Sequence, residues 1–269
     1  MVKNKLVLHD ISFSILSSYE TCYDKIKALM TELKTYLTSE GFNVKYYEDD
    51  AKQSATVEIR REGYDTYFRY VMTYYSDTQA ILKFGIFTKS QKYQSTTESR
   101  CTITDTDYTL LAFYIVTDNF IGFRVYYVNS SLDSQGFDYK SNQFIIKSES
   151  GDEYYKYSGS TSHIYKSETN TVIAVPSPVN TGNIDKAILK KLPAGTSYLK
   201  GVYLLDLPSR GSLITSTNIS GGIYVNLTGY GKFLCFSSGV ERLLFAVKLD
   251  EEETTETVTT TPTDESQTI

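Results

Sequence analysis

Paired carboxylates are the residues of this sequence whose spacing is best suited to acid–base chemistry. Asp49-Asp50, Asp105-Asp107 and Asp152-Glu153 each fall in a polar segment. Two carboxyl groups that converge in a cleft can act as general acid and general base. Loop carboxylates are more often solvated, or occasionally bind calcium, and no further ligand set accompanies these pairs. We therefore expect no metal site and no cofactor, and a carboxylate-based hydrolase is the least favoured of three functional hypotheses.

Other catalytic residue types are scarce. The chain has only two histidines, His9 and His163, and three widely separated cysteines, Cys22, Cys101 and Cys235. No motif of a serine hydrolase, a phosphate-binding loop, a zinc protease or an EF-hand is present. Without a CxxC pair, the cysteines indicate neither a zinc site nor a disulfide framework. We therefore predict that the protein is not an enzyme.

The composition favours binding over catalysis. The chain contains 24 Tyr and 13 Phe but no Trp. Tyrosine-rich surfaces bind proteins well, although tyrosine is also an ordinary strand residue. The net charge is −5, but seven of the 32 acidic residues lie in 250–269, which leaves 25 acidic against 27 basic residues elsewhere. The sequence has no basic stripe, so no nucleic-acid partner is predicted.

The amino terminus lacks the continuous apolar stretch of a secretion signal. No run approaches the roughly 20 apolar residues that a membrane span needs. We therefore expect a protein made and folded in a reducing cytoplasm, with no membrane partner.

The most apolar stretch, Tyr108–Val128, predicts two strands joined through Asp118-Asn119. The register that follows pairs Val116 with Ile121, Tyr114 with Phe123, Phe113 with Arg124 and Leu111 with Tyr126. One face is wholly apolar, and the other mixes apolar side chains with Arg124. Such a hairpin belongs in mid-sheet with both faces covered, one by the protein's own core and the other by a helix, a second sheet or another subunit.

An amphipathic helix is predicted over Ser18–Glu40. Ser17 followed by Glu20 forms a capping box, and Gly41 ends the helix. Apolar residues from Tyr19 to Leu37 recur at steps of three and four, so we expect this stripe to pack on the protein's own sheet.

Four strands follow the helix and favour an antiparallel meander. They are predicted at Phe42–Glu48, Ala55–Arg61, Tyr64–Tyr75 and Ala80–Thr88. The second has one polar face and is interpreted as half-exposed or an edge strand. The third carries Tyr67 and Arg69 on a face that is aromatic and cationic. Polar Lys89–Asp107 is predicted to be a long loop.

The fold class predicted is α+β, mainly antiparallel, with the helix on a meander followed by a small β sandwich or barrel. Polar residues from Ser130 suggest a boundary, so the expected units are 1–130, 131–249 and an acidic Thr-rich tail, 250–269. Within the second unit, Ile184–Leu192 is predicted to form a short helix ended by Pro193. The tail cannot bury enough apolar surface to fold alone.

Along its whole length the chain resembles virion proteins of tailed bacteriophages, particularly tail, neck and baseplate components. The likeness rests on the opening helix, the Tyr-rich strands through Val128, the polar segment Lys89–Asp107 and the acidic tail. It implies a structural subunit of the virion, made in the host cytoplasm, that assembles with copies of itself and with other virion proteins.

The residues expected at such an interface are Tyr67, Arg69, Phe113, Arg124, Tyr126, Asp250, Glu251, Glu252 and Glu253. The alternative is a carbohydrate- or receptor-binding module of a tail tip or adhesin. Aromatic β surfaces do bind sugars, but tryptophan, the best stacking residue, is absent.

Overall fold

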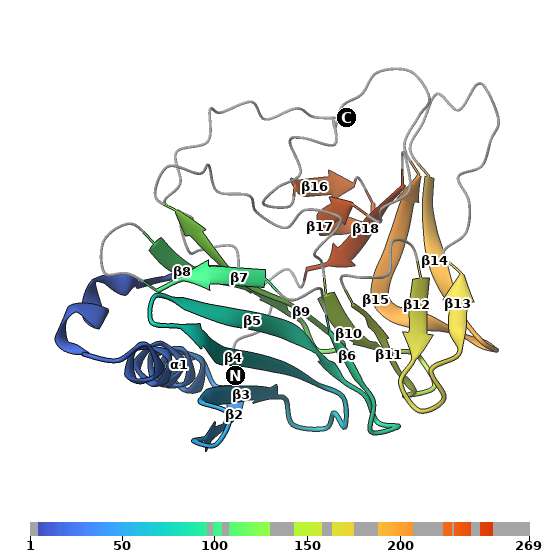
Figure 1. Ribbon diagram of the computed structural model, residues 1–269. Coiled ribbons are helices and arrows are strands. Elements are labelled where there is room, and N and C mark those ends of the chain that lie inside the picture. Colours follow the sequence, from blue (N-terminus) through green and yellow to red (C-terminus); the bar gives the residue numbers. More distant parts are fainter. Residues whose placement is uncertain are drawn as a thin grey trace.

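The structure, a computed structural model, describes residues 5–95, 99–103, 108–129, 143–157, 163–174, 188–206, 223–227, 229–237 and 243–249. Within these ranges the chain forms one α-helix and three β-sheets (Figure 1). Every strand pairing described is antiparallel. The fold is therefore α+β and mainly antiparallel, as the sequence predicts.

The helix α1 (Cys22–Ser39) begins later than predicted, because the expected capping box does not form. Ser17 instead lies in a 3₁₀-helix, η1 (Phe13–Ser18). Thr21 is the N-cap: its backbone is extended, and its Oγ1 accepts a hydrogen bond of 3.1 Å from the backbone N–H of Asp24. A residue inside a 3₁₀ turn cannot take the extended conformation that an N-cap needs, so the cap moves to the next suitable hydroxyl.

The end of α1 agrees with the sequence. Gly41 has a φ of +86°, which glycine adopts without strain. The N–H of Phe42 donates to the carbonyl of Leu37, and that of Gly41 to the carbonyl of Thr38. This is the Schellman arrangement of a helix C-terminus.

A six-stranded sheet lies against α1 and is a meander, as predicted. Its strands are β2 (Asn43–Asp49), β3 (Ser54–Arg60), β4 (Tyr67–Ser76), β5 (Gln79–Phe87), β6 (Tyr93–Ser95) and β7 (Ser99–Thr102). The order is β2-β3-β4-β5-β6, and β7 also pairs with β5.

Two predictions about this sheet are wrong. β3 lies between β2 and β4 and is not an edge strand, because arginines on its own face and on β4 satisfy its buried Glu58. The segment Lys89–Asp107 is not simply a loop, because β6 and β7 pair with the free edge of β5. Backbone hydrogen bonds to an existing edge make strands there even though the side chains are polar.

The seven-stranded sheet contains the predicted hairpin. Its strands are β1 (Lys5–Ser12), β8 (Tyr108–Val116), β9 (Phe120–Asn129), β10 (Gln143–Lys147), β11 (Glu153–Lys156), β12 (His163–Lys166) and β13 (Val172–Ala174), in the order β1-β8-β9-β10-β11-β12-β13. The hairpin register is confirmed: Val116 lies opposite Ile121 and Phe113 opposite Arg124. Pairing also continues across the boundary expected at residue 130, because β9 and β10 are neighbours.

The five-stranded sheet comprises β14 (Ile188–Ala194), β15 (Ser197–Asp206), β16 (Ile223–Leu227), β17 (Gly231–Ser237) and β18 (Leu243–Lys248), in the order β14-β15-β18-β17-β16. The helix predicted over Ile184–Leu192 is wrong within the described residues, where the chain forms β14. The register of β14 shifts between Lys191 and Pro193. An edge strand with an irregularity accepts a proline, which has no N–H to donate.

The seven-stranded sheet is the middle layer and lies between two cores. Ile145 and Tyr155 belong to the first core, which α1 and the six-stranded sheet complete. Their chain neighbours Phe144, Ile146 and Tyr154 belong to the second core, which the five-stranded sheet completes. Successive side chains of a strand point to opposite faces, so these short strands are buried on both sides. A second sheet therefore covers the other face of the middle layer.

Glu153 links the six-stranded sheet to the seven-stranded sheet by accepting hydrogen bonds from uncharged donors. Its carboxylate accepts hydrogen bonds of 2.9 and 2.8 Å from the backbone N–H groups of Asp65 and Thr66, just before β4. The Thr66 hydroxyl, within a residue that is 1% exposed, donates to the same carboxylate at 2.6 Å and lies 2.5 Å from the hydroxyl of Ser167. This polar junction fixes the connection between β3 and β4 against β11.

Candidate binding surface

The face of the six-stranded sheet that points away from α1 carries the most concentrated group of charges described in the structure. On the opposite face, Val57, Phe68 and Tyr70 are buried in the first core. Because side chains alternate along a strand, Glu58 and Arg69 point the other way. Cross-strand register also places Glu58 directly opposite Arg69 on this face. We call it the outer face.

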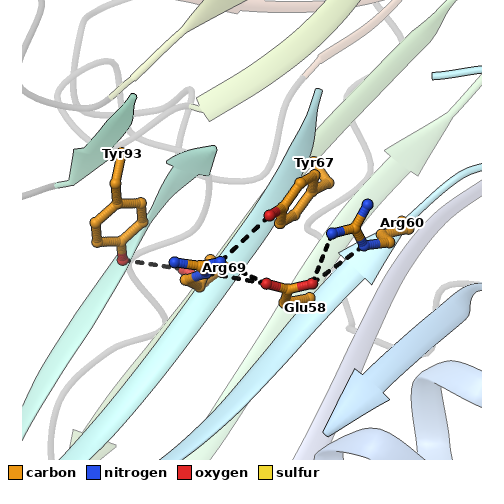
Figure 2. Close-up of polar contacts among 5 residues, drawn as sticks. All are labelled: Glu58, Arg60, Tyr67, Arg69 and Tyr93. Carbon is orange, nitrogen blue, oxygen red and sulfur yellow. Dashed lines mark hydrogen bonds and ion pairs between the residues drawn. The ribbon is translucent and has the colours of Figure 1, made fainter. Parts of the chain in front are cut away.

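Glu58 is the centre of the outer face. Its side chain is 4% exposed, and both of its carboxylate oxygens are engaged by arginines. Oε2 accepts hydrogen bonds of 3.1 and 2.8 Å from Nε and Nη2 of Arg60, and Oε1 accepts bonds of 3.2 and 2.6 Å from the same atoms of Arg69 (Figure 2). Charge-assisted bonds of this kind hold both guanidinium groups in fixed positions.

An aromatic ring lies beneath each of the two guanidinium groups. The Arg60 guanidinium lies 3.6 Å from the centre of the Tyr67 ring, and that of Arg69 lies 4.5 Å from the centre of Phe87. The two rings stack with their centres 5.1 Å apart. Tyr93 donates its hydroxyl to the backbone carbonyl of Arg69 at 3.2 Å. The Glu58 cluster, defined as Glu58, Arg60, Tyr67, Arg69, Phe87 and Tyr93, is thus a layer of cations on rings.

The charges of the cluster reinforce one another. Burial by itself would raise the pKa of the Glu58 carboxyl, but hydrogen bonds and positive charge from Arg60 and Arg69 outweigh it and lower that pKa. Burial opposes the charge on Arg69, yet the bond to Glu58 raises the pKa of the guanidinium. Burial is also the largest cause of the raised pKa of the Tyr67 phenol. One carboxylate between two guanidinium groups therefore leaves one net positive charge.

Further basic residues extend the outer face beyond the cluster. Lys45 lies opposite Glu58, Lys83 opposite Val71 and Arg100 opposite Ile81. Among the described residues of these strands, the charged side chains on this face are Lys45, Arg60, Arg69, Lys83, Arg100, Glu58 and Asp49. Five are basic and two are acidic, so the face has a net positive charge.

The basic residues of this face are separated from one another in the sequence. This explains why the sequence itself shows no basic stripe. Each alternates with core residues along its own strand, and only strand pairing brings them together. Two tyrosines of the same sheet are well exposed, Tyr47 at 48% and Tyr75 at 43%. Tyr75 lies under the Arg100 guanidinium, 4.2 Å from it.

Some of the residues predicted at an interface come together here. Tyr67 and Arg69 lie in the Glu58 cluster, where Arg69 Nη2 donates to the Tyr67 hydroxyl at 3.2 Å. For Phe113, Arg124 and Tyr126 the structure describes the backbone register but not the side chains. The remaining predicted positions, Asp250, Glu251, Glu252 and Glu253, lie outside the described residues.

The sequence did not single out Glu58, Arg60, Phe87 or Tyr93 as site residues. Alternation in their strands is a signal for the first three, because it places a carboxylate, a guanidinium and a ring on the face that also holds Tyr67. Tyr93 gives no such signal, because it lies in a polar segment whose pairing with β5 is not visible from local pattern.

The carboxylate pairs considered for catalysis have other partners. Asp49 forms an ion pair with Lys52 at 2.9 Å, and Asp152 forms one with Lys166 at 3.2 Å. Asp105 and Asp107 lie outside the described residues.

The buried cysteine Cys235 is also unsuited to nucleophilic chemistry. Burial raises the pKa of the Cys235 thiol to about 12, so it stays protonated at neutral pH.

The described residues contain no group of three or more His, Cys, Asp or Glu side chains placed to hold a metal ion. No helix in the same part of the chain is long and apolar enough to cross a membrane.

A cavity of about 260 Å³ adjoins the outer face at Arg60. It lies between the end of α1, at Glu40 and Gly41, and Val116 of the hairpin. Its lining mixes carboxylates with guanidinium groups, so it has no single charge preference.

No known protein family, curated protein or solved structure matches this chain. What the outer face does must therefore follow from its own contacts.

Proposed function

We propose that the protein is a non-enzymatic structural subunit of a virus particle, of the tail, neck or baseplate kind that its sequence resembles. In this proposal it is made in the host cytoplasm and acts by assembling with copies of itself and with other virion proteins. The observation that carries the proposal is the outer face, where strand pairing brings five basic residues together and three of them, Arg60, Arg69 and Arg100, lie over aromatic rings.

Preorganisation supports a binding role for this face. The guanidinium groups of Arg60 and Arg69 are already held by Glu58 and by the rings beneath them. Ordering a long side chain on binding costs about 0.5–1.5 kcal/mol, and these two are largely ordered in advance. Their side chains are still 29% and 28% exposed, so a partner can reach them.

The state of Glu58 argues against acid–base catalysis at the same place. Its oxygens accept four N–H donors, and its lowered pKa keeps it ionised at neutral pH. A general acid or base near neutral pH needs a pKa closer to 7 and a proton path to substrate. The carboxylate is therefore best suited to holding the two arginines in position.

The carbohydrate-binding alternative is less well supported at this surface. Sugars stack on open aromatic faces, but a guanidinium group lies over the rings of Tyr67, Phe87 and Tyr75. What the face offers a partner is positive charge, which favours an anionic protein surface.

The mass of the protein in solution tests this proposal. Sedimentation velocity over a range of concentrations, alone and after co-expression with the products of neighbouring genes, should show oligomers or mixed complexes. Oligomers held by the outer face should dissociate as salt rises from 50 to 500 mM, values chosen because the Debye length then falls from about 14 to about 4 Å. A protein that stays monomeric under all of these conditions would contradict an assembly role.

A further inference from the structure

We propose that the acidic segment 250–269 of one copy docks on the outer face of the six-stranded sheet of a second copy. This inference rests on the proposed function and identifies the contact by which the subunits would join.

Charge complementarity is the first argument. Residues 250–269 contain seven acidic side chains and neither lysine nor arginine. Their sizeable aliphatic residues are Val258 and Ile269. The outer face has five described basic residues against two acidic residues, Glu58 and Asp49. An acidic peptide with few apolar groups is the partner that such a face selects.

The cluster geometry is the second argument. The Nε and Nη2 atoms of each guanidinium are used by Glu58, and the ring below each group fixes its plane. The exposed part of each arginine, together with Lys45 on β2, remains to contact carboxylates from outside. Guanidinium groups bind carboxylates well because their donors lie in one plane.

The open edge of the sheet is the third argument. β2 is the last strand in the sheet order, so one of its edges has no neighbouring strand in the described sheet. Its residues Lys45 and Tyr47 are exposed. An extended acidic peptide can pair with such an edge through backbone hydrogen bonds while its carboxylates meet the basic side chains.

The position of Leu249 indicates that the occupant comes from a second copy. Leu249 packs in the second core, between the middle and five-stranded sheets. The outer face lies beyond the first core, at the opposite side of the layer stack. To reach the outer face of its own molecule, the segment 250–269 must pass around the middle sheet. If the five-stranded sheet of one copy stacks on the outer face of the next, Leu249 lies close to that outer face.

This contact joins two different surfaces of identical subunits. Such heterologous contacts generate closed rings when the rotation between subunits closes, and helical filaments when it does not. The proposed contact therefore leads to a closed ring or to a filament, according to the rotation between neighbouring subunits.

A complementation experiment with full-length chains tests the proposal. The face variant carries Lys45→Glu and Lys83→Glu, and the tail variant carries Glu251→Gln, Glu252→Gln, Glu253→Gln and Glu256→Gln. The control carries Lys25→Glu and Lys34→Glu, two lysines of α1, which lies on the opposite side of the sheet from the outer face, with the same change in total charge. Masses are measured by sedimentation velocity, and thermal unfolding shows which variants are folded.

The expected result is that wild type and control form oligomers, while the face and tail variants alone are each monomeric. Their dissociation constants should rise roughly tenfold or more, because several charge contacts are lost together. An equimolar mixture of the two variants should form dimers and nothing larger, since only one productive contact is possible. If the face variant does not fold, the milder Lys45→Gln and Lys83→Gln pair replaces it.

Three results would overturn the proposal. If the face variant and the tail variant form oligomers of the same mass as wild type, the protein assembles through a different contact. A mixture that stays monomeric while wild type associates would exclude exchange of the segment between copies. The third result has two parts: wild type stays monomeric, and it binds a single-stranded oligonucleotide that the face variant does not bind. That result would assign the outer face to a phosphate polymer instead.

Discussion

Glu58 and Glu153 are two carboxylates that the same fold treats in different ways. Glu58 is bound by two charged guanidinium groups on the outer face, whereas Glu153 is bound by backbone N–H groups and a hydroxyl between two layers. Both have their oxygens well occupied. The difference lies in the donors. The donors to Glu153 are uncharged, so they do not neutralise its negative charge. The two arginines bring two positive charges to the single negative charge of Glu58, which leaves a net charge of +1.

In this fold, Glu153 stabilises the packing of two layers, whereas Glu58 positions charged groups that a partner can reach. The backbone donors of Asp65 and Thr66 are fixed by the chain, so Glu153 can hold two layers together without any charged group on their contact. The donors to Glu58 are long side chains whose remaining atoms stay partly exposed. The first arrangement fixes the fold, and the second also supplies positive charge to a partner.

Glu58→Gln should give the largest change in stability. Loss of the negative charge leaves two guanidinium groups close together without their counter-ion, and we expect the free energy of unfolding to fall by roughly 2–4 kcal/mol. Urea denaturation measures this loss. Because the change makes the outer face more positive, association with the acidic segment should be retained. A stable variant that no longer associates would mean that Glu58 contacts the partner directly.

Glu153→Gln should have a smaller effect on stability. An amide can accept from one side only, so one backbone N–H at the junction loses its acceptor, at a cost of roughly 1–3 kcal/mol. Glu149→Gln is the matched control, because Glu149 forms an exposed ion pair with Lys191. Exposed pairs of this kind contribute about 0–1 kcal/mol. Equal losses for the two variants would refute a special role for the junction.

Acid should weaken the protein through Glu58. The pKa of this carboxyl is lower in the folded protein than its ordinary value of 4.5. Its stabilising contribution is therefore complete above that value and is lost as pH falls through the lower, folded-state pKa. The unfolding midpoint should decline less steeply with acid in Glu58→Gln than in wild type. Identical acid limbs would show that Glu58 does not contribute to this decline.

Tyr93→Phe should have the smallest effect of the four. It removes the hydroxyl that donates to the Arg69 carbonyl but keeps the ring, so we expect a loss of about 0.5–1.5 kcal/mol. Tyr47→Phe, on an exposed tyrosine of β2 at the opposite edge of the sheet, serves as its control. A larger loss for Tyr47 than for Tyr93 would mean that the hydrogen bond of Tyr93 does not support Arg69.

Local pattern was sufficient for elements whose partners are close in sequence. The hairpin register of β8 and β9, the meander from β2 to β5 and the glycine at the end of α1 all follow from alternation, turn residues or helix capping. Pattern failed where two local solutions compete. Ser17 and Thr21 can each cap a helix, and the residues of β14 read equally well as a short helix before Pro193.

Periodicity alone was enough to predict an amphipathic helix, many antiparallel strands, and an aromatic, cationic face that holds Tyr67 and Arg69. Three features depend on contacts between segments far apart in the chain: the hairpin is part of a middle layer between two cores, polar residues form β6 and β7, and Glu58 joins Arg60 to Arg69. The physical reason is that periodicity records which side of a strand is buried but not which distant strand lies beside it. A surface built from residues on several strands exists only once those strands have paired.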